Sequence, residues 1–133
     1  MEHDDPEDLA SRTRRFALAV VRLYVSLPRA TVSYVLGRQL LESGTSVGAQ
    51  YREARRAKSN ADFISKLEGA LQELDETGYW LELLREARIA KAEAVDKLMR
   101  EVNELISVFV SIVRKVKAAS PRRAWASTPI GRQ

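Results

Sequence analysis

The chain has 133 residues, of which 45% are hydrophobic and 30% charged, a size and composition suited to one folded domain. It contains no cysteine, which excludes disulfide bonds, thiolate metal ligands and cysteine nucleophiles. The net charge is +4, but residues 1–8 carry five acids and no Lys or Arg, whereas residues 114–133 carry six bases and no acid. Such a one-sided basic terminus indicates either an acidic partner or a solubilising tail, and the sequence leaves both open.

The acidic beginning of the chain is unlike a secretory signal or a transit peptide. The longest strongly apolar run, residues 105–113, has nine residues, whereas a membrane span needs about 20. We therefore expect a cytoplasmic protein without a membrane segment.

Residues 6–26 are predicted to form the first helix, because apolar side chains recur there at spacings of seven, four, three and four. These side chains are Leu9, Phe16, Val20, Leu23 and Leu27. Asp5 before Pro6 suits an N-cap followed by proline at the first helical position. Pro28 is expected to end the helix, because the residue before a proline avoids the α region.

The second helix is predicted from residue 29 or 31 to residue 57. Its apolar stripe is expected to consist of Val32, Val35 or Leu36, Leu40, Ser43, Val47, Gln50 and Ala54. Gly37, Gly44 and Gly48 interrupt this helix, each at a cost of about 1 kcal/mol relative to alanine. Small residues there allow a neighbouring helix to approach closely, and we expect one continuous helix rather than a break near Gly44.

The third helix is predicted to begin at Ser59, which forms a capping-box variant with Asp62, and to end around residues 85–88. Its stripe alternates by four and three: Phe63, Leu67, Ala70, Leu74, Thr77, Leu81 and Leu84. The fourth helix, residues 92–119, has the same spacing in Val95, Leu98, Val102, Leu105, Phe109, Ile112 and Val116. The sequence therefore predicts an all-α protein, an antiparallel up-down-up-down four-helix bundle over residues 1–119 with a flexible basic tail over residues 120–133.

The fourth helix carries more apolar surface than one bundle seam requires. The additional apolar residues are Met99, Ile106, Val108, Val110 and Val113. A helix that is apolar nearly all round must be buried, and a small bundle covers only one side of it. These residues are therefore predicted to form an interface between copies of the chain.

The sequence contains no constellation typical of an enzyme. A di-iron site in a helical bundle needs Glu-x-x-His pairs, but the only histidine is His3 and the Glu73-x-x-Glu76 pair is not followed by one. Gly44-x-x-x-Gly48 lacks the Gly-Lys-Ser/Thr ending of a phosphate-binding loop. We expect no enzymatic activity, no cofactor and no metal site.

A set of polar residues falls on or beside the facing stripes of the second and third helices. The set consists of Gln50, Glu53, Glu73, Glu76, Thr77 and Trp80. Polar groups at core positions need hydrogen-bond partners. One interpretation is an internal network that fixes the register of the two helices, and the other is a ligand or contact site.

A basic cluster marks the end of the second helix. It consists of Arg52, Arg55, Arg56 and Lys58, and the tail adds Arg122 and Arg123. Cations at a helix C-terminus interact favourably with the helix dipole, which is a sufficient structural explanation. Repeated in an oligomer, the same residues would form a basic ring able to bind phosphates, so they are the candidate nucleic-acid-binding residues.

Four segments between residues 39 and 84 form a specific combination of motifs: QLLxSGTSVGA at residues 39–49, YREA at 51–54, SxxDFIxKL at 59–67 and ExxETxYWLELL at 73–84. In this combination the chain resembles the four-helix-bundle family of proteins encoded in intervening sequences of 23S rRNA genes. The accessory variability determinant of diversity-generating retroelements is a relative of that family. The family usually has asparagine where this chain has Gln50.

The resemblance implies a four-helix protomer that assembles into a homopentameric barrel and associates with nucleic acid. For the retroelement relatives it implies a reverse transcriptase and RNA as partners. Together with the residues, it favours a non-enzymatic oligomeric protein that binds nucleic acid or assists a ribonucleoprotein. The alternative is a protein-binding scaffold with no nucleic-acid role, and the choice between RNA and DNA stays open.

Overall fold

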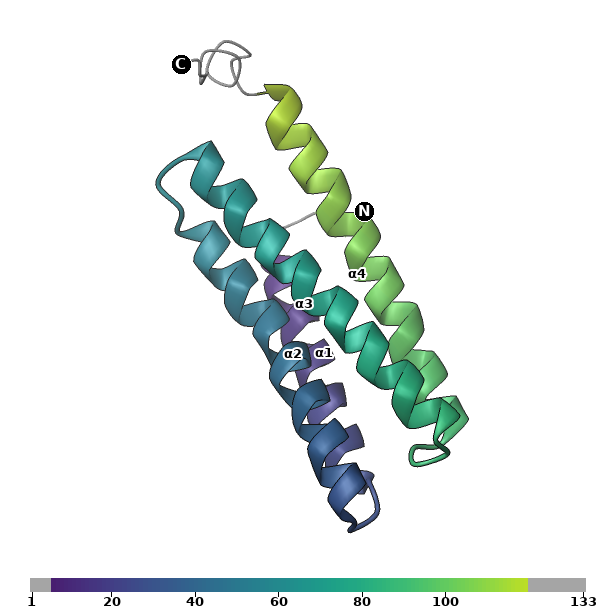
Figure 1. The fold of residues 1–133 in the computed structure, drawn as a ribbon. Helices are drawn as coiled ribbons and strands as arrows, with labels where there is room; N and C mark the ends of the chain where they lie inside the picture. Colours follow the sequence, from purple (N-terminus) through teal and green to yellow (C-terminus); the bar gives the residue numbers. More distant parts are fainter. Residues whose placement is uncertain (1–5, 120–133) are drawn as a thin grey trace, which may run out of the picture.

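The computed structural model describes residues 6–119, with side chains from residue 9 onward. Within this range the chain forms four α-helices and no strand: α1 (Pro6–Ser26), α2 (Thr31–Arg55), α3 (Asn60–Glu86) and α4 (Ala92–Ala119). Short connections turn each helix back along the one before it (Figure 1). The predicted all-α four-helix fold is confirmed, and α2 ends two residues earlier than expected. The predicted tail lies outside the described residues.

Local sequence signals set the helix boundaries. α1 ends at Ser26, just before the step into Pro28. Ser59 caps α3 as predicted, because its hydroxyl accepts a hydrogen bond from the Asp62 amide at 3.1 Å. α2 continues through Gly44 without a break, as expected.

The core consists of one stripe of buried side chains from each helix. The stripes of α1, α3 and α4 agree with the predicted spacings over most of their length. Near one end of the core the rings of Tyr51 and Phe109 stack with their centroids 5.8 Å apart. This contact joins α2 to α4 through the interior of the bundle.

The buried face of α2 differs from the predicted one. Val32 and Val35 are each 51% exposed, whereas Ser33 and Gly37 are buried. The seven buried positions that keep an unbroken spacing of four and three are Ser33, Gly37, Leu40, Gly44, Val47, Tyr51 and Ala54. The predicted stripe was wrong at the N-terminal end of α2, because it assumed that the apolar side chains there face the core. The face with the smallest residues packs against α1 instead.

Two glycines of α2 bring α1 close. A Cβ atom at Gly37 would lie 2.8 Å from the Tyr24 ring, and one at Gly44 would lie 2.8 Å from both methyl groups of Val20. An alanine at either position would therefore force the neighbouring side chain, or α1 itself, to shift. The predicted role of small residues in close helix packing agrees with this geometry.

The contact between α1 and α4 is much smaller than the contacts between consecutive helices. Across it, Arg12 donates to both carboxylate oxygens of Glu101, at 2.7 and 2.9 Å, and to Glu104 at 3.3 Å. The hydrogen bond to Glu101 is the main cause that raises the pKa of Arg12 above its ordinary value. The last turns of α4 extend past the beginning of α1 (Figure 1), so α1 covers only part of the length of α4.

Candidate nucleic-acid interface

The four cations predicted from the end of α2 are all exposed. Arg52 and Arg55 lie in the last turn of α2, Arg56 is its C-cap residue, and Lys58 lies in the connection to α3. The two tail residues of the prediction, Arg122 and Arg123, lie outside the described residues.

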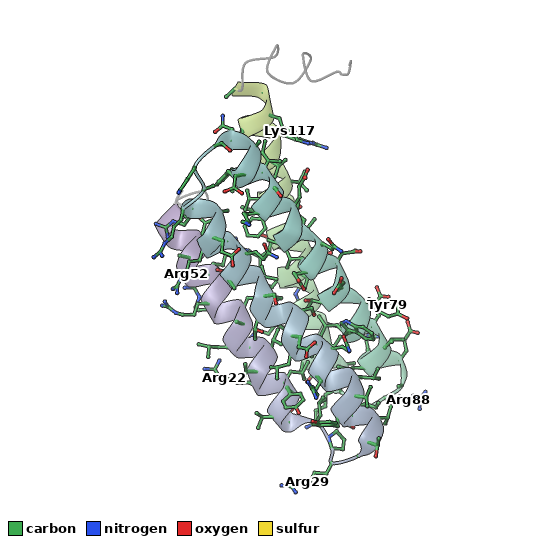
Figure 2. The ribbon with its side chains drawn as sticks, turned by 60° about the vertical axis from the view of Figure 1, so that its left-hand side comes forward. Arg22, Arg29, Arg52, Tyr79, Arg88 and Lys117 are labelled. Carbon is green, nitrogen blue, oxygen red and sulfur yellow. The ribbon has the colours of Figure 1, made fainter. Side chains whose placement is uncertain are left out.

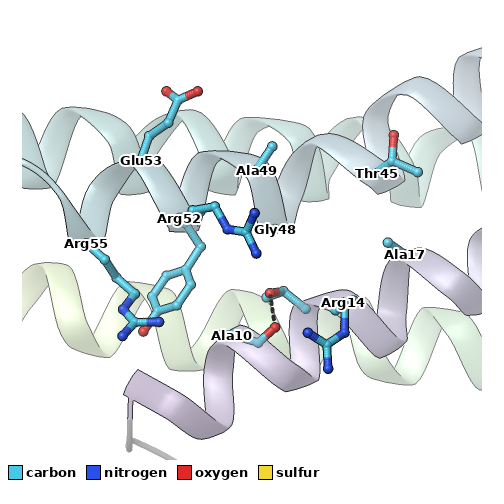
Figure 3. Close-up of a pocket in the computed structure, with 11 residues that line it drawn as sticks. Ala10, Arg14, Ala17, Thr45, Gly48, Ala49, Arg52, Glu53 and Arg55 are labelled. Atoms are coloured by element: carbon cyan, nitrogen blue, oxygen red, sulfur yellow. Dashed lines mark hydrogen bonds between the residues drawn. The ribbon is translucent and has the colours of Figure 1, made fainter.

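Arg52 and Arg55 line a groove between α1 and α2, which we call the α1/α2 groove. Its volume is about 500 Å³. Arg14 reaches the same space from α1 (Figure 3). The remaining lining residues are Ala10, Thr13, Ala17, Thr45, Gly48, Ala49, Tyr51 and Glu53.

The wall of the α1/α2 groove is firmly packed. A Cβ atom at Gly48 would lie 3.2 Å from the Thr13 hydroxyl oxygen, so the two helices are close at this point. The Arg55 guanidinium lies 6.0 Å from the centroid of the Tyr51 ring, which itself stacks on Phe109 in the core. The arginines therefore stand on a wall of small and aromatic residues.

The charge in the α1/α2 groove is predominantly positive. Glu53 is its one lining carboxylate among the described residues, and it points away from Arg14 (Figure 3). Glu53 forms an ion pair with Lys66 of α3 at 3.9 Å. In the described part of the chain, no carboxylate lies within ion-pair distance of Arg14 or Arg52. Arg14 and Arg52 therefore present guanidinium groups that anions can reach.

The predicted polar set does not form one network in the described structure. Thr77 of α3 is fully buried and donates its hydroxyl to Ser43 of α2 at 2.9 Å, while lying 2.8 Å from the Glu73 carbonyl oxygen. Ser43 in turn lies 3.3 Å from the Leu40 carbonyl oxygen. The hydrogen-bond partner of Thr77 on α2 is therefore Ser43 rather than Gln50.

The other members of the set have separate contacts. Gln50 packs over Gly69 of α3, where a Cβ atom would lie 2.9 Å from the Gln50 side-chain oxygen. Trp80 meets Tyr79 edge-on, with ring centroids 5.0 Å apart. Burial, and secondly the charge of Glu76, raise the pKa of the Glu73 carboxyl above its ordinary value. These contacts resemble local packing more than a shared ligand site.

The residues predicted to join copies of the chain have unequal positions. Val113 is only 6% exposed and belongs to the core of the single chain, so it is not part of a second apolar face. Val108 and Val110 are half-buried, whereas Met99 and Ile106 line a surface groove between α3 and α4.

Sequence reasoning missed Arg14 and Ser43. Arg14 lies between Ala10 and Ala17 on the side of α1 that faces the small residues of α2. A cation flanked by alanines, opposite a glycine-rich helix, was the available signal. Ser43 was assigned to the stripe, but its polar pairing depended on the register between α2 and α3, which one helix does not reveal.

Two features are absent from the described part of the chain. No helix there has an apolar stretch long enough to cross a membrane. No three His, Asp or Glu side chains there are grouped so that they could hold a metal ion. His3 lies outside the described residues.

The comparisons with known proteins agree on one family. The chain is similar to a protein of unknown function from the S23 ribosomal protein family of Bacteroides thetaiotaomicron, whose crystal structure matches with 38% identity and a TM-score of 0.77. The match covers 82% of this chain and 97% of that one. No curated protein matches. The family model described as 23S rRNA-intervening sequence protein matches residues 8–111, and the chain therefore belongs to that family.

Proposed function

We propose that this chain is a non-enzymatic, homo-oligomeric protein that binds nucleic acid through the α1/α2 groove. The observation that carries the proposal is the convergence of Arg14 with Arg52 and Arg55 from a second helix. Guanidinium groups bind phosphate oxygens through two parallel hydrogen bonds, which suits them to a nucleic-acid backbone.

The surroundings of the groove support this use. Its small residues, among them Gly48 and Ala49, leave room for a phosphate to reach the guanidinium groups. Arg56 and Lys58 lie beyond the lining residues and extend the positive surface toward the connection between α2 and α3. Contacts of this kind neutralise phosphates without reading bases, so little sequence preference is expected.

One subunit is a weak polycation. The tail carries three arginines and no acid, so only +1 of the net charge of +4 remains on residues 1–119. Strong binding therefore needs several grooves on one assembly, and the homopentamer implied by the resemblance would supply them. We include the pentamer, and a reverse transcriptase as a ribonucleoprotein partner, in the proposal.

The test is binding of single-stranded RNA and duplex DNA from about 50 to about 200 mM salt. Arg14→Gln combined with Arg52→Gln should weaken binding. In a plot of the logarithm of the binding constant against the logarithm of the salt concentration, the slope should become shallower by about one unit for each lost phosphate contact. The matched control, Arg29→Gln with Lys91→Gln, removes the same charge from exposed positions outside the groove.

Three outcomes separate the alternatives. Equal losses in the groove variant and in the control would mean that only net charge matters. Loss on deletion of residues 120–133 alone would assign binding to the basic tail. If the full chain binds neither RNA nor DNA at about 50 mM salt, the proposal is wrong and the protein-binding scaffold replaces it.

A further inference from the structure

A second and larger groove separates α1 from α4, where the two helices share little contact. This α1/α4 groove has a volume of about 810 Å³. Its floor contains Phe16, Leu23 and Leu98, which belong to the core. A groove of this size with an apolar floor can bind a large side chain from a partner.

The rim of the α1/α4 groove is basic. Arg15, Arg22, Lys97 and Arg100 are exposed along it. The two carboxylates of the groove, from Glu101 and Glu104, both bind Arg12. The four exposed cations therefore favour a partner whose apolar residue is flanked by carboxylates.

The opposite side of α4 offers a surface with that chemistry. Tyr79 of α3 is 55% exposed and stands between Asp75 and Glu82, one turn before it and one turn after it. Met99 and Ile106 of α4 complete a shallow groove of about 280 Å³ beside these residues. We call this surface the Tyr79 face.

We propose that the α1/α4 groove of one copy binds the Tyr79 face of a second copy, so that copies of the chain join head to tail. Tyr79 then packs on the floor near Phe16, while Asp75 and Glu82 meet the basic rim. This inference rests on the homo-oligomer of the proposed function and specifies the surfaces that form it.

The arrangement of the two surfaces supports repeated association. Arg22 and Tyr79 project from opposite sides of the bundle (Figure 2), so a copy bound through one surface leaves the other free. Such a heterologous contact forms a ring where its rotation closes. Two α1/α4 grooves facing each other would instead bring their basic rims together, which disfavours a symmetric dimer through this surface.

The same contact leaves the α1/α2 groove free. Arg12 and Arg15 line the side of α1 toward α4, whereas Ala10 and Arg14 line the side toward α2. An assembly of this kind would therefore multiply the proposed nucleic-acid sites without covering them.

Charge reversal provides the test, with the mass measured by light scattering in the absence of nucleic acid. Asp75→Arg with Glu82→Arg should raise the dissociation constant of the assembly about tenfold or more, and Arg22→Glu with Arg100→Glu should do the same. The chain carrying all four changes has both surfaces reversed, so it should assemble again. The control, Arg56→Glu with Lys58→Glu, reverses two cations outside both surfaces and should leave the mass unchanged.

Tyr79→Ala keeps every charge and should also weaken assembly, with helicity by circular dichroism unchanged. The inference is overturned if both reversed pairs assemble like the original chain, or if the four changes together give no recovery. The inference is also overturned if the original chain has the mass of a monomer in the absence of nucleic acid. The Arg14 and Arg52 variant tests the nucleic-acid site separately, so the two failures are distinguishable.

Discussion

Thr77 of α3 and Ser43 of α2 share a hydrogen bond of 2.9 Å in the interior of the bundle, where Thr77 is fully buried and Ser43 is 3% exposed. The bond lies between the two helices that share the most extensive contact in the chain. It allows two polar side chains to occupy core positions, because each has a partner there.

Replacing Thr77 by valine should lower the free energy of unfolding by about 1 kcal/mol, because the shape is kept and the hydrogen bond is lost. In the Thr77→Val variant, Ser43→Ala should destabilise the protein less than the same change does in the original chain, because the hydrogen bond between the two residues is already lost. Urea unfolding at one fixed protein concentration measures both changes. Gln50→Leu is the control, and its effect on the free energy of unfolding should simply add to the effect of Thr77→Val. If the two effects do not add, Gln50 and Thr77 interact as the predicted network required.

Gly44→Ala should destabilise the protein by about 1–3 kcal/mol despite the better helix propensity of alanine, because the new Cβ atom would overlap with Val20. Gly78→Ala is the matched control. There the nearest atoms, from Met99 and Val102, lie 3.9 Å from the Cβ position, so alanine should stabilise by up to about 1 kcal/mol. Thermal unfolding of the two variants should shift in opposite directions, and a stabilising Gly44→Ala would contradict the close α1–α2 contact.

Arg12→Met should loosen α1 from α4. The side chain of Arg12 is 15% exposed and has a two-point contact with Glu101, so its loss should cost about 1 kcal/mol. Hydrogen exchange should rise in α1 before the rest of the bundle, because the α1–α4 contact is much smaller than the contacts between consecutive helices. Arg38→Met removes an exposed ion pair to Glu42 and should leave exchange in α1 unchanged.

Glu73→Gln should stabilise the protein at neutral pH and have no effect at acidic pH. The raised pKa of Glu73 means that the folded state binds its proton more tightly than the unfolded state. Stability from this group is therefore present below the ordinary carboxyl pKa and lost as the pH rises through the raised value. The free energy of unfolding, measured across that pH window, should depend less on pH in the Glu73→Gln variant than in the original chain. If both proteins show the same dependence, Glu73 is not its cause.

The sequence alone determined the elements and most of the core. Spacings of four and three along α3 and α4 identify the buried positions, because a helix exposes one face to its neighbours at that period. Pro28 and the Ser59 cap mark two boundaries through purely local backbone chemistry. The end of α2 was also marked by its cations, of which Arg52 and Arg55 lie in the last turn.

Only the tertiary structure decided which faces of the helices meet. On α2 the glycines face α1 and leave Val32 and Val35 exposed, because close backbone approach there replaces the burial of larger side chains. The neighbours of Arg52 follow from the same packing, since Arg14 enters the groove only when α1 lies beside α2. Contacts of this kind join residues far apart in the chain, and the relative rotation and register of two helices are properties of the pair that the pattern of either helix leaves open.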